Sequence, residues 1–98
     1  MSIDDDREAI AKILGSTMYS TSIKLWDSST LINLDTIDGI ASLWPKGWTW
    51  KRYVRESFGW FAMADDNYTD FVFVPDSNNE LADRTRLLRL VLESKASP

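Results

Sequence analysis

The hydrophobic residues of this chain are most concentrated between Phe58 and Pro75, where two apolar runs flank a polar cluster. The runs cover residues 60–64 and 69–74, and residues 65–68 between them read Asp-Asp-Asn-Tyr. Phe, Trp and Val favour a pleated, half-buried backbone, whereas Asp and Asn tolerate the dihedral angles of a turn. The pattern therefore predicts a β-hairpin.

A hairpin loop of two or four residues predicts one register, in which Ala62 lies opposite Phe71 and Trp60 lies opposite Phe73. Side chains alternate across a strand, so this register assigns every residue to a face. One face would carry Trp60, Ala62, Ala64, Phe71 and Phe73, and the other would carry Phe61, Met63, Val72 and Val74. Because both faces are apolar, each requires a cover, from helices of this chain or from a partner.

Helical periodicity marks three other segments. Residues 4–14 predict a helix with acids in its first turn, ended by Gly15. A second helix is predicted to start at Asp35 and to stop before Pro45. The longest, Leu81–Ser94, has a broad apolar stripe that we expect to pack on the Trp60 face of the hairpin. Its outward-facing residues are expected to be Arg84, Arg86 and Arg89.

The remaining segments are less regular. Polar and apolar residues alternate along 16–26, which predicts a strand, and residues 31–34 are apolar enough for a short second strand. Residues 48–58 fit either a helix, with Trp50 and Tyr53 on one stripe, or a strand, in which Arg52 interrupts the apolar row. The helix fits better.

Together these elements predict an α+β fold. An antiparallel sheet of three or four strands, built on the 60–74 hairpin, is expected to be packed by the N-terminal and C-terminal helices. Ninety-eight residues suit a single globular domain spanning 1–98, with 95–98 as a loose tail.

Composition argues against catalysis and cofactor binding. The chain has no Cys and no His, which removes the thiolate nucleophile, the commonest general base and the usual zinc ligands. The acidic cluster at 65–70 lacks the Gly of a calcium loop. We therefore expect no enzyme activity, no catalytic residues, no cofactor and no metal site.

The N-terminal segment is acidic, unlike a signal peptide, and no apolar run approaches the roughly 18 residues of a membrane span. These features predict a soluble, cytoplasmic protein without membrane association. The net charge is −4, and residues 65–83 hold six acids and no base. This balance favours a partner with a basic surface over nucleic acid.

The leading functional hypothesis is a small protein-binding module that occupies a partner's surface, as an inhibitor, immunity protein or accessory subunit does. It rests on abundant aromatics beside acidic clusters, a combination typical of recognition hot spots. The expected contact residues are Trp48, Phe61, Met63, Asp65, Asp66 and Asp70. We expect Trp48 to be the most exposed aromatic of the 44–53 region.

Two alternatives remain open. The first is a single-stranded nucleic-acid binder, because aromatics interleaved with cations can stack on bases and hold phosphates. Its residues would be Trp48, Trp50, Lys51, Arg52 and Arg55. The second is a homodimer formed through the Phe61/Met63/Val72/Val74 face.

Overall fold

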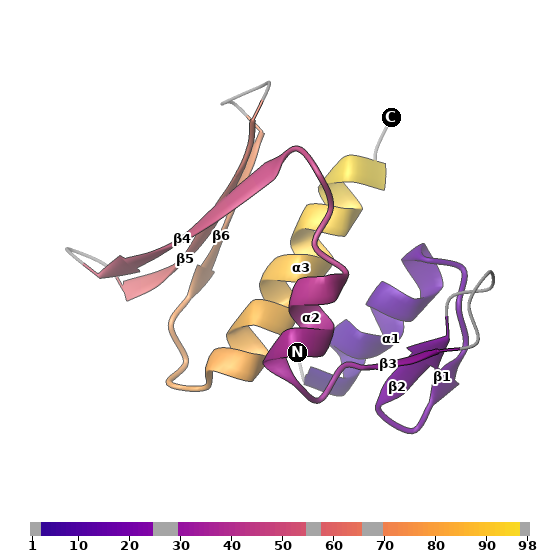
Figure 1. The fold of residues 1–98 in the computed structure, drawn as a ribbon. Coiled ribbons are helices and arrows are strands. Elements are labelled where there is room, and N and C mark those ends of the chain that lie inside the picture. Colours follow the sequence, from indigo (N-terminus) through magenta and orange to yellow (C-terminus); the bar gives the residue numbers. More distant parts are fainter. Residues whose placement is uncertain (1–2, 25–29, 55–57, 66–69, 97–98) are drawn as a thin grey trace.

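The computed structural model describes residues 3–24, 30–54, 58–65 and 70–96, and it has the predicted α+β fold (Figure 1). In chain order, the elements are α1 (Ile3–Ile13), β1 (Met18–Tyr19), β2 (Ser22–Lys24), β3 (Leu31–Asn33), α2 (Ile37–Ser42), β4 (Trp48–Val54), β5 (Phe58–Ala64), β6 (Phe71–Pro75) and α3 (Glu80–Ala96). The strands form two three-stranded antiparallel sheets, ordered β1-β2-β3 and β4-β5-β6. The second of these contains the predicted hairpin, and the first is an additional sheet.

The long helix α3 lies between two hydrophobic cores (Figure 1). On one side, Leu88 and Leu92 pack with residues of α1, α2 and the β1–β3 sheet, such as Ile10 and Ile23. On the other side, Leu87 and Val91 pack against the β4–β6 sheet; we call this second cluster the sheet core. The prediction that this helix packs on the Trp60 face of the sheet is therefore confirmed. The N-terminal helix packs against α3 rather than directly on the β4–β6 sheet.

The first helix ends where the sequence predicts. Gly15 adopts a φ of 68°, which L side chains rarely tolerate, and the backbone N–H of Ser16 donates to the carbonyl of Ala11 at 2.8 Å. A further bond from the Gly15 N–H to the Lys12 carbonyl, at 3.1 Å, completes a Schellman cap.

The second helix begins one position later than Asp35 would suggest. Thr36 is its N-cap, and the Thr36 hydroxyl accepts a hydrogen bond from the Gly39 N–H at 3.0 Å. Gly39 also allows α2 to approach β3 closely, because a Cβ at this position would stand 1.8 Å from the carbonyl oxygen of Asn33. The small residue thus fixes how α2 packs on the first sheet.

The helix predicted over residues 48–58 is wrong, because this segment contains strand β4. It pairs with β5 along its whole length, from Trp48 opposite Ala64 to Val54 opposite Phe58. Arg52 interrupts the apolar row without breaking the strand. Its guanidinium lies 5.3 Å from the centroid of the Trp60 ring and pairs with Asp76 at 2.9 Å, so the cation covers the aromatic surface.

The predicted hairpin is present, but its register differs by one residue. Trp60 lies opposite Val74, and the Ala64 N–H donates to the Asp70 carbonyl at 2.9 Å, which leaves the five residues 65–69 between the paired positions. A shift of one residue moves every side chain of a strand to the other face. The predicted faces are therefore wrong for all four β6 residues assigned to them. Val72 and Val74 lie on the Trp60 side, and Phe71 and Phe73 lie on the Phe61 side.

The shorter predicted elements are partly confirmed. The single strand predicted over 16–26 is instead a hairpin of two short strands, β1 and β2, with Ser20 at a φ of 61° in the turn. Residues 25–26 of that segment lie outside the described residues. The expected strand over 31–34 is β3. At the C-terminus α3 continues to Ala96 and so includes the first residues of the expected tail.

Candidate functional site

The face of the β4–β6 sheet opposite the sheet core carries a contiguous group of side chains. Strand alternation and the observed register place side chains from all three strands there, and two from each strand define the group. We call this surface the outer face; its residues are Thr49, Lys51, Phe61, Met63, Phe71 and Phe73. Four of the six are large and apolar, and they belong to the neighbouring strands β5 and β6.

These apolar side chains are substantially exposed. Phe71 is 57% exposed and Phe73 is 39% exposed, while Phe61 and Met63 are half-buried. In Figure 1 the helices α2 and α3 lie on the other side of this sheet, and within the described residues no element covers the outer face. Exposed apolar surface that extends across two strands is typical of an interaction site.

The aromatic rings of the outer face are held in place by the sheet. The Phe61 and Phe71 rings stack with their centroids 5.4 Å apart and their planes 27° apart. The Phe73 ring lies over Gly59, where a Cβ would stand 2.4 Å from its Cζ atom. Because the rings are already ordered in the free protein, they lose little conformational entropy when a partner binds them.

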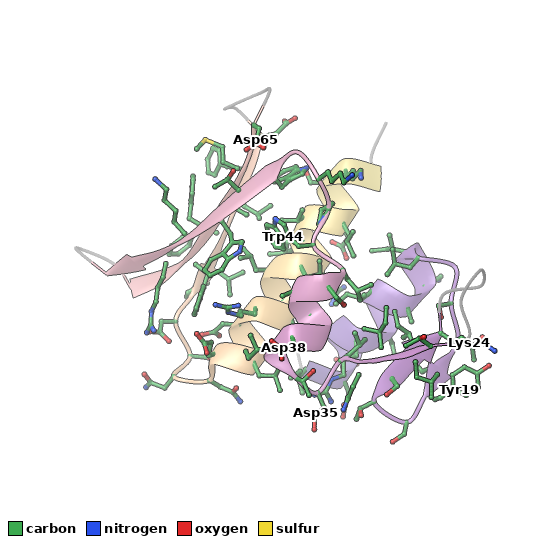
Figure 2. The ribbon with its side chains drawn as sticks, in the orientation of Figure 1. Tyr19, Lys24, Asp35, Asp38, Trp44 and Asp65 are labelled. Atoms are coloured by element: carbon green, nitrogen blue, oxygen red, sulfur yellow. The ribbon has the colours of Figure 1, made fainter. Side chains whose placement is uncertain are left out.

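Two acidic residues lie at the loop end of the β4–β6 sheet. Asp65 and Asp70 are both exposed, and Figure 2 shows Asp65 at the tip of the sheet. The hydroxyl of Thr49 donates to the Asp65 carboxylate at 2.6 Å, and the Asp65 N–H donates to the Gly47 carbonyl at 2.8 Å. These bonds fix Asp65 beside the outer face. Asp66, another expected contact residue, lies outside the described residues.

At the opposite end of the sheet, Asp76 follows β6 and is tied to the backbone. The Asn78 N–H donates to its carboxylate at 2.9 Å, and Arg52 binds the other carboxylate oxygen at 2.9 Å. The backbone hydrogen bond, and after it the guanidinium of Arg52, hold the pKa of Asp76 below its ordinary value of 3.8. Asp76 is therefore ionised well into the acid range, and it belongs to the end of the strand rather than to the outer face.

The expected contact residue Trp48 does not lie on the outer face. It is half-buried against the sheet core, and its carbonyl accepts a hydrogen bond from the Trp44 indole Nε1–H at 2.7 Å. The more exposed aromatic is Trp50, at 38%. Of the expected contacts, Phe61 and Met63 do lie together on the outer face, and Asp65 lies beside it. Asp70 is exposed at the same end of the sheet.

The four residues of the dimer face expected from the sequence lie on opposite faces of the sheet. Val74 is buried beneath α3 and Val72 lies on the same side, so neither shares a surface with Phe61 and Met63. The register places Phe71 and Phe73 there instead. Sequence reasoning missed these two residues because it assumed an even number of loop residues.

The residues of the nucleic-acid alternative are split between the two faces of β4. Trp48, Trp50 and Arg52 point toward the helices, while Lys51 points outward. Arg55 lies outside the described residues. The Trp50 ring is engaged within the protein, 5.6 Å from the Trp60 ring and 4.3 Å from the guanidinium carbon of Arg84. These positions do not form one continuous binding surface.

Two of the arginines expected to face outward are engaged instead. Arg89 binds the buried carboxylate of Asp6 on α1 at 2.9 Å. Arg84 lies over the Trp50 and Trp60 rings. A helix that packs on two sides leaves little outward surface, which helical periodicity alone did not reveal.

No protein-family model matches this chain, and neither the curated proteins nor the solved structures that were compared include a significant match. Within the described residues, no group of acidic side chains is arranged to hold a metal ion. Among the helices that the structure describes, none combines the length and the apolar character needed to cross a bilayer.

Proposed function

We propose that this protein is a small, non-catalytic cytoplasmic module that binds another protein and acts by occupying its surface, as an inhibitor, immunity protein or accessory subunit does. The observation that carries the proposal is the uncovered aromatic group Phe61, Phe71 and Phe73, together with Met63. Aromatic residues and Met are enriched at the centres of protein interfaces. The lack of His and Cys in the chain is consistent with binding rather than chemistry.

The chemistry of the outer face favours a partner with an apolar groove bordered by basic residues. The rings supply apolar contact area at its centre, and Asp65 and Asp70 supply negative charge at its rim. Such a rim mainly accelerates association and selects the partner, whereas the buried rings determine how slowly the complex dissociates. Lys51, in the same face, would meet an acid or a backbone carbonyl of the partner.

Comparative capture from the native host tests this proposal. The wild-type protein and a Phe71→Lys/Phe73→Lys variant are immobilised, with Tyr19→Ser/Leu31→Ser as the matched control. The control residues are each 53% exposed and lie on the other sheet. A partner retained by the wild type and the control but lost by the lysine variant supports the proposal. Equal retention by all three proteins, or no retained protein, contradicts it.

A purified partner then permits a sharper measurement. Asp65→Asn/Asp70→Asn should slow association and flatten its dependence on salt, because the rim charges act at long range. The dissociation rate should change little. If the association rate is unchanged, the two acids do not border the contact surface.

Self-association is the second candidate, because the outer face carries apolar rings and both signs of charge. Sedimentation of the free protein at micromolar and near-millimolar concentrations tests it. A dimer that disappears in Phe71→Lys/Phe73→Lys supports it, and a monomer at both concentrations rules it out. Titration with a single-stranded oligonucleotide at low salt, followed by Trp fluorescence, tests the nucleic-acid alternative, which the split of its residues does not favour.

A further inference from the structure

A cavity of about 200 Å³ opens between α2, β4 and α3, on the side of the sheet opposite the outer face. Its walls come from all three elements; the lining residues are Ile40, Ala41, Trp44, Trp50, Arg84 and Leu87. Figure 2 shows Trp44 at the end of α2, between the sheet and α3. The cavity is separate from the proposed docking surface.

The cavity has an apolar wall and a single cationic group. Five of the six lining residues are apolar or aromatic, and the sixth is Arg84. The Arg84 guanidinium carbon lies 4.3 Å from the centroid of the Trp50 ring and 5.1 Å from that of Trp60, so two aromatic faces hold it in place. An apolar pocket with one fixed polar group is the usual form of a small-molecule site.

The hydrogen-bonding capacity of Arg84 is not met within the described residues. Its Nε atom is buried without a hydrogen-bond partner. The neighbouring acid, Glu80, stands with Oε1 3.7 Å from Nη2, which is beyond hydrogen-bonding distance, and the Glu80 side chain is 51% exposed. The Arg84 side chain is four-fifths buried, and its ion pair with Glu80 is longer than a hydrogen bond, so its terminal nitrogens can bind a closer anion.

We propose that this cavity binds a small carboxylate with an aromatic or branched apolar body. The carboxylate accepts hydrogen bonds from the terminal nitrogens of Arg84, and the body lies against Trp44, Trp50 and Ile40. The size follows from the volume, since an apolar cavity of about 150 Å³ accommodates benzene. A cavity of about 200 Å³ therefore suits a ligand of roughly ten non-hydrogen atoms, such as phenylacetate.

Arg84 also has a structural role as a cover for the two tryptophan rings. That role alone predicts a loss of stability in an Arg84 variant, but it predicts neither carboxylate binding nor discrimination by ligand charge. The experiment is therefore built on matched probes. Phenylacetate carries the carboxylate, and phenylacetamide has the same shape without the charge.

The readout is the indole N–H resonances of Trp44 and Trp50 in ¹H–¹⁵N spectra of the full chain during titration with each probe. Phenylacetate should give saturable shifts with a dissociation constant on the order of 1 mM or tighter. Phenylacetamide should bind at least about tenfold more weakly, because the charge-assisted hydrogen bonds are lost. Equal binding of the two probes, or no saturable shift up to 20 times the expected constant, overturns the proposal.

Four variants locate the site. Ala41→Leu should abolish the response by filling the cavity, and because Ala41 is exposed its substitution leaves the fold intact. Arg84→Gln should weaken phenylacetate binding by about tenfold or more. Glu80→Gln should tighten it by about twofold, since a competing charge is removed. Arg86→Gln, on the same helix but away from the cavity lining, is the control and should leave binding unchanged. Unaltered binding in Ala41→Leu, or a loss in Arg86→Gln equal to that in Arg84→Gln, overturns the assignment.

Discussion

The register of the β5–β6 hairpin decides which side chains form the outer face, and two serine substitutions on one strand test it. Phe71 and Val74 both lie on β6, and the observed register places them on opposite faces. Val74 is 2% exposed and Phe71 is 57% exposed. The register predicted from the sequence reverses this arrangement, so the two registers give opposite expectations for Phe71→Ser and Val74→Ser.

The magnitudes follow from burial. Full burial of a Val side chain contributes about 2 kcal/mol. A serine hydroxyl left in the sheet core without a partner adds about 1 kcal/mol or more. Val74→Ser should therefore destabilise the protein by about 3 to 4 kcal/mol. For Phe71, less than half of the side chain is buried, so its contribution is about 1 kcal/mol, or about 2 kcal/mol with the Phe61 stacking included.

Urea unfolding followed by tryptophan fluorescence measures both values. With a slope of about 1 to 1.5 kcal/mol per molar urea, Val74→Ser should lower the midpoint by roughly 2 M or more, and Phe71→Ser by roughly 1 M. Repeating the scan at a tenfold higher protein concentration separates self-association from folding, because only a dimer has a concentration-dependent midpoint. If the Phe71 substitution costs more than the Val74 substitution at both concentrations, the outer face described above does not exist.

Three further predictions concern the framework that supports this sheet. Gly39→Ala should lower the thermal midpoint by about 10 °C or more, because its Cβ would stand 1.8 Å from a backbone carbonyl oxygen of β3. Asp6→Ala should cost about 2 kcal/mol in urea unfolding, because Arg89 then keeps only its bond to Glu93. A double variant that also carries Arg89→Met should cost less than the sum of the single changes, since Arg89→Met alone leaves the buried Asp6 carboxylate without that cation. Carboxyl NMR should give Asp76 a pKa below 3.8, because the Asn78 N–H stabilises the ionised form. Since the folded pKa is lowered, this contribution to stability is complete above pH 3.8 and disappears as the pH falls through the lower folded value. A pKa at or above 3.8 would contradict the hydrogen bond.

The sequence signals that predict α1 and α3 lie within a few residues of each helix. Gly15 ends α1 because the left-handed conformation is tolerated by Gly, and that information lies in one residue and its immediate neighbours. The apolar stripe of α3 likewise identified the helix, although it did not show that α3 packs on two sides. These predictions needed no knowledge of distant residues, which is why they are confirmed.

The β4 strand could not be identified in the same way. Arg52 appeared to interrupt the apolar row, whereas in the fold its charge is balanced by Asp76, and its stem lies along Trp60. Both partners lie on other elements of the chain. A helical stripe through Trp50 and Tyr53 was therefore the better local fit, and tertiary contacts reversed the preference.

The hairpin register was ambiguous for a different reason. Alternation selects a register when one face is apolar and the other is polar. Here Phe71 and Phe73 alternate with Val72 and Val74, so a slip of one residue exchanges one apolar set for another. The number of loop residues then decides the register, and the composition of the 65–69 segment does not specify that number.

The apolar character of the outer face bears directly on function. Both hydrophobic cores of the fold are formed without outer-face residues, so the cores do not require apolar side chains there. The Trp60 side of the sheet is filled by Leu87 and Val91 of α3, and the other core lies beyond that helix. Polar side chains on the outer face would favour a single register, at a folding cost limited to that of partly exposed rings. The stacked Phe61 and Phe71 rings provide no such preference for one register. Their presence is explained if a partner covers them, and this is why the lysine substitutions should abolish binding while the fold persists.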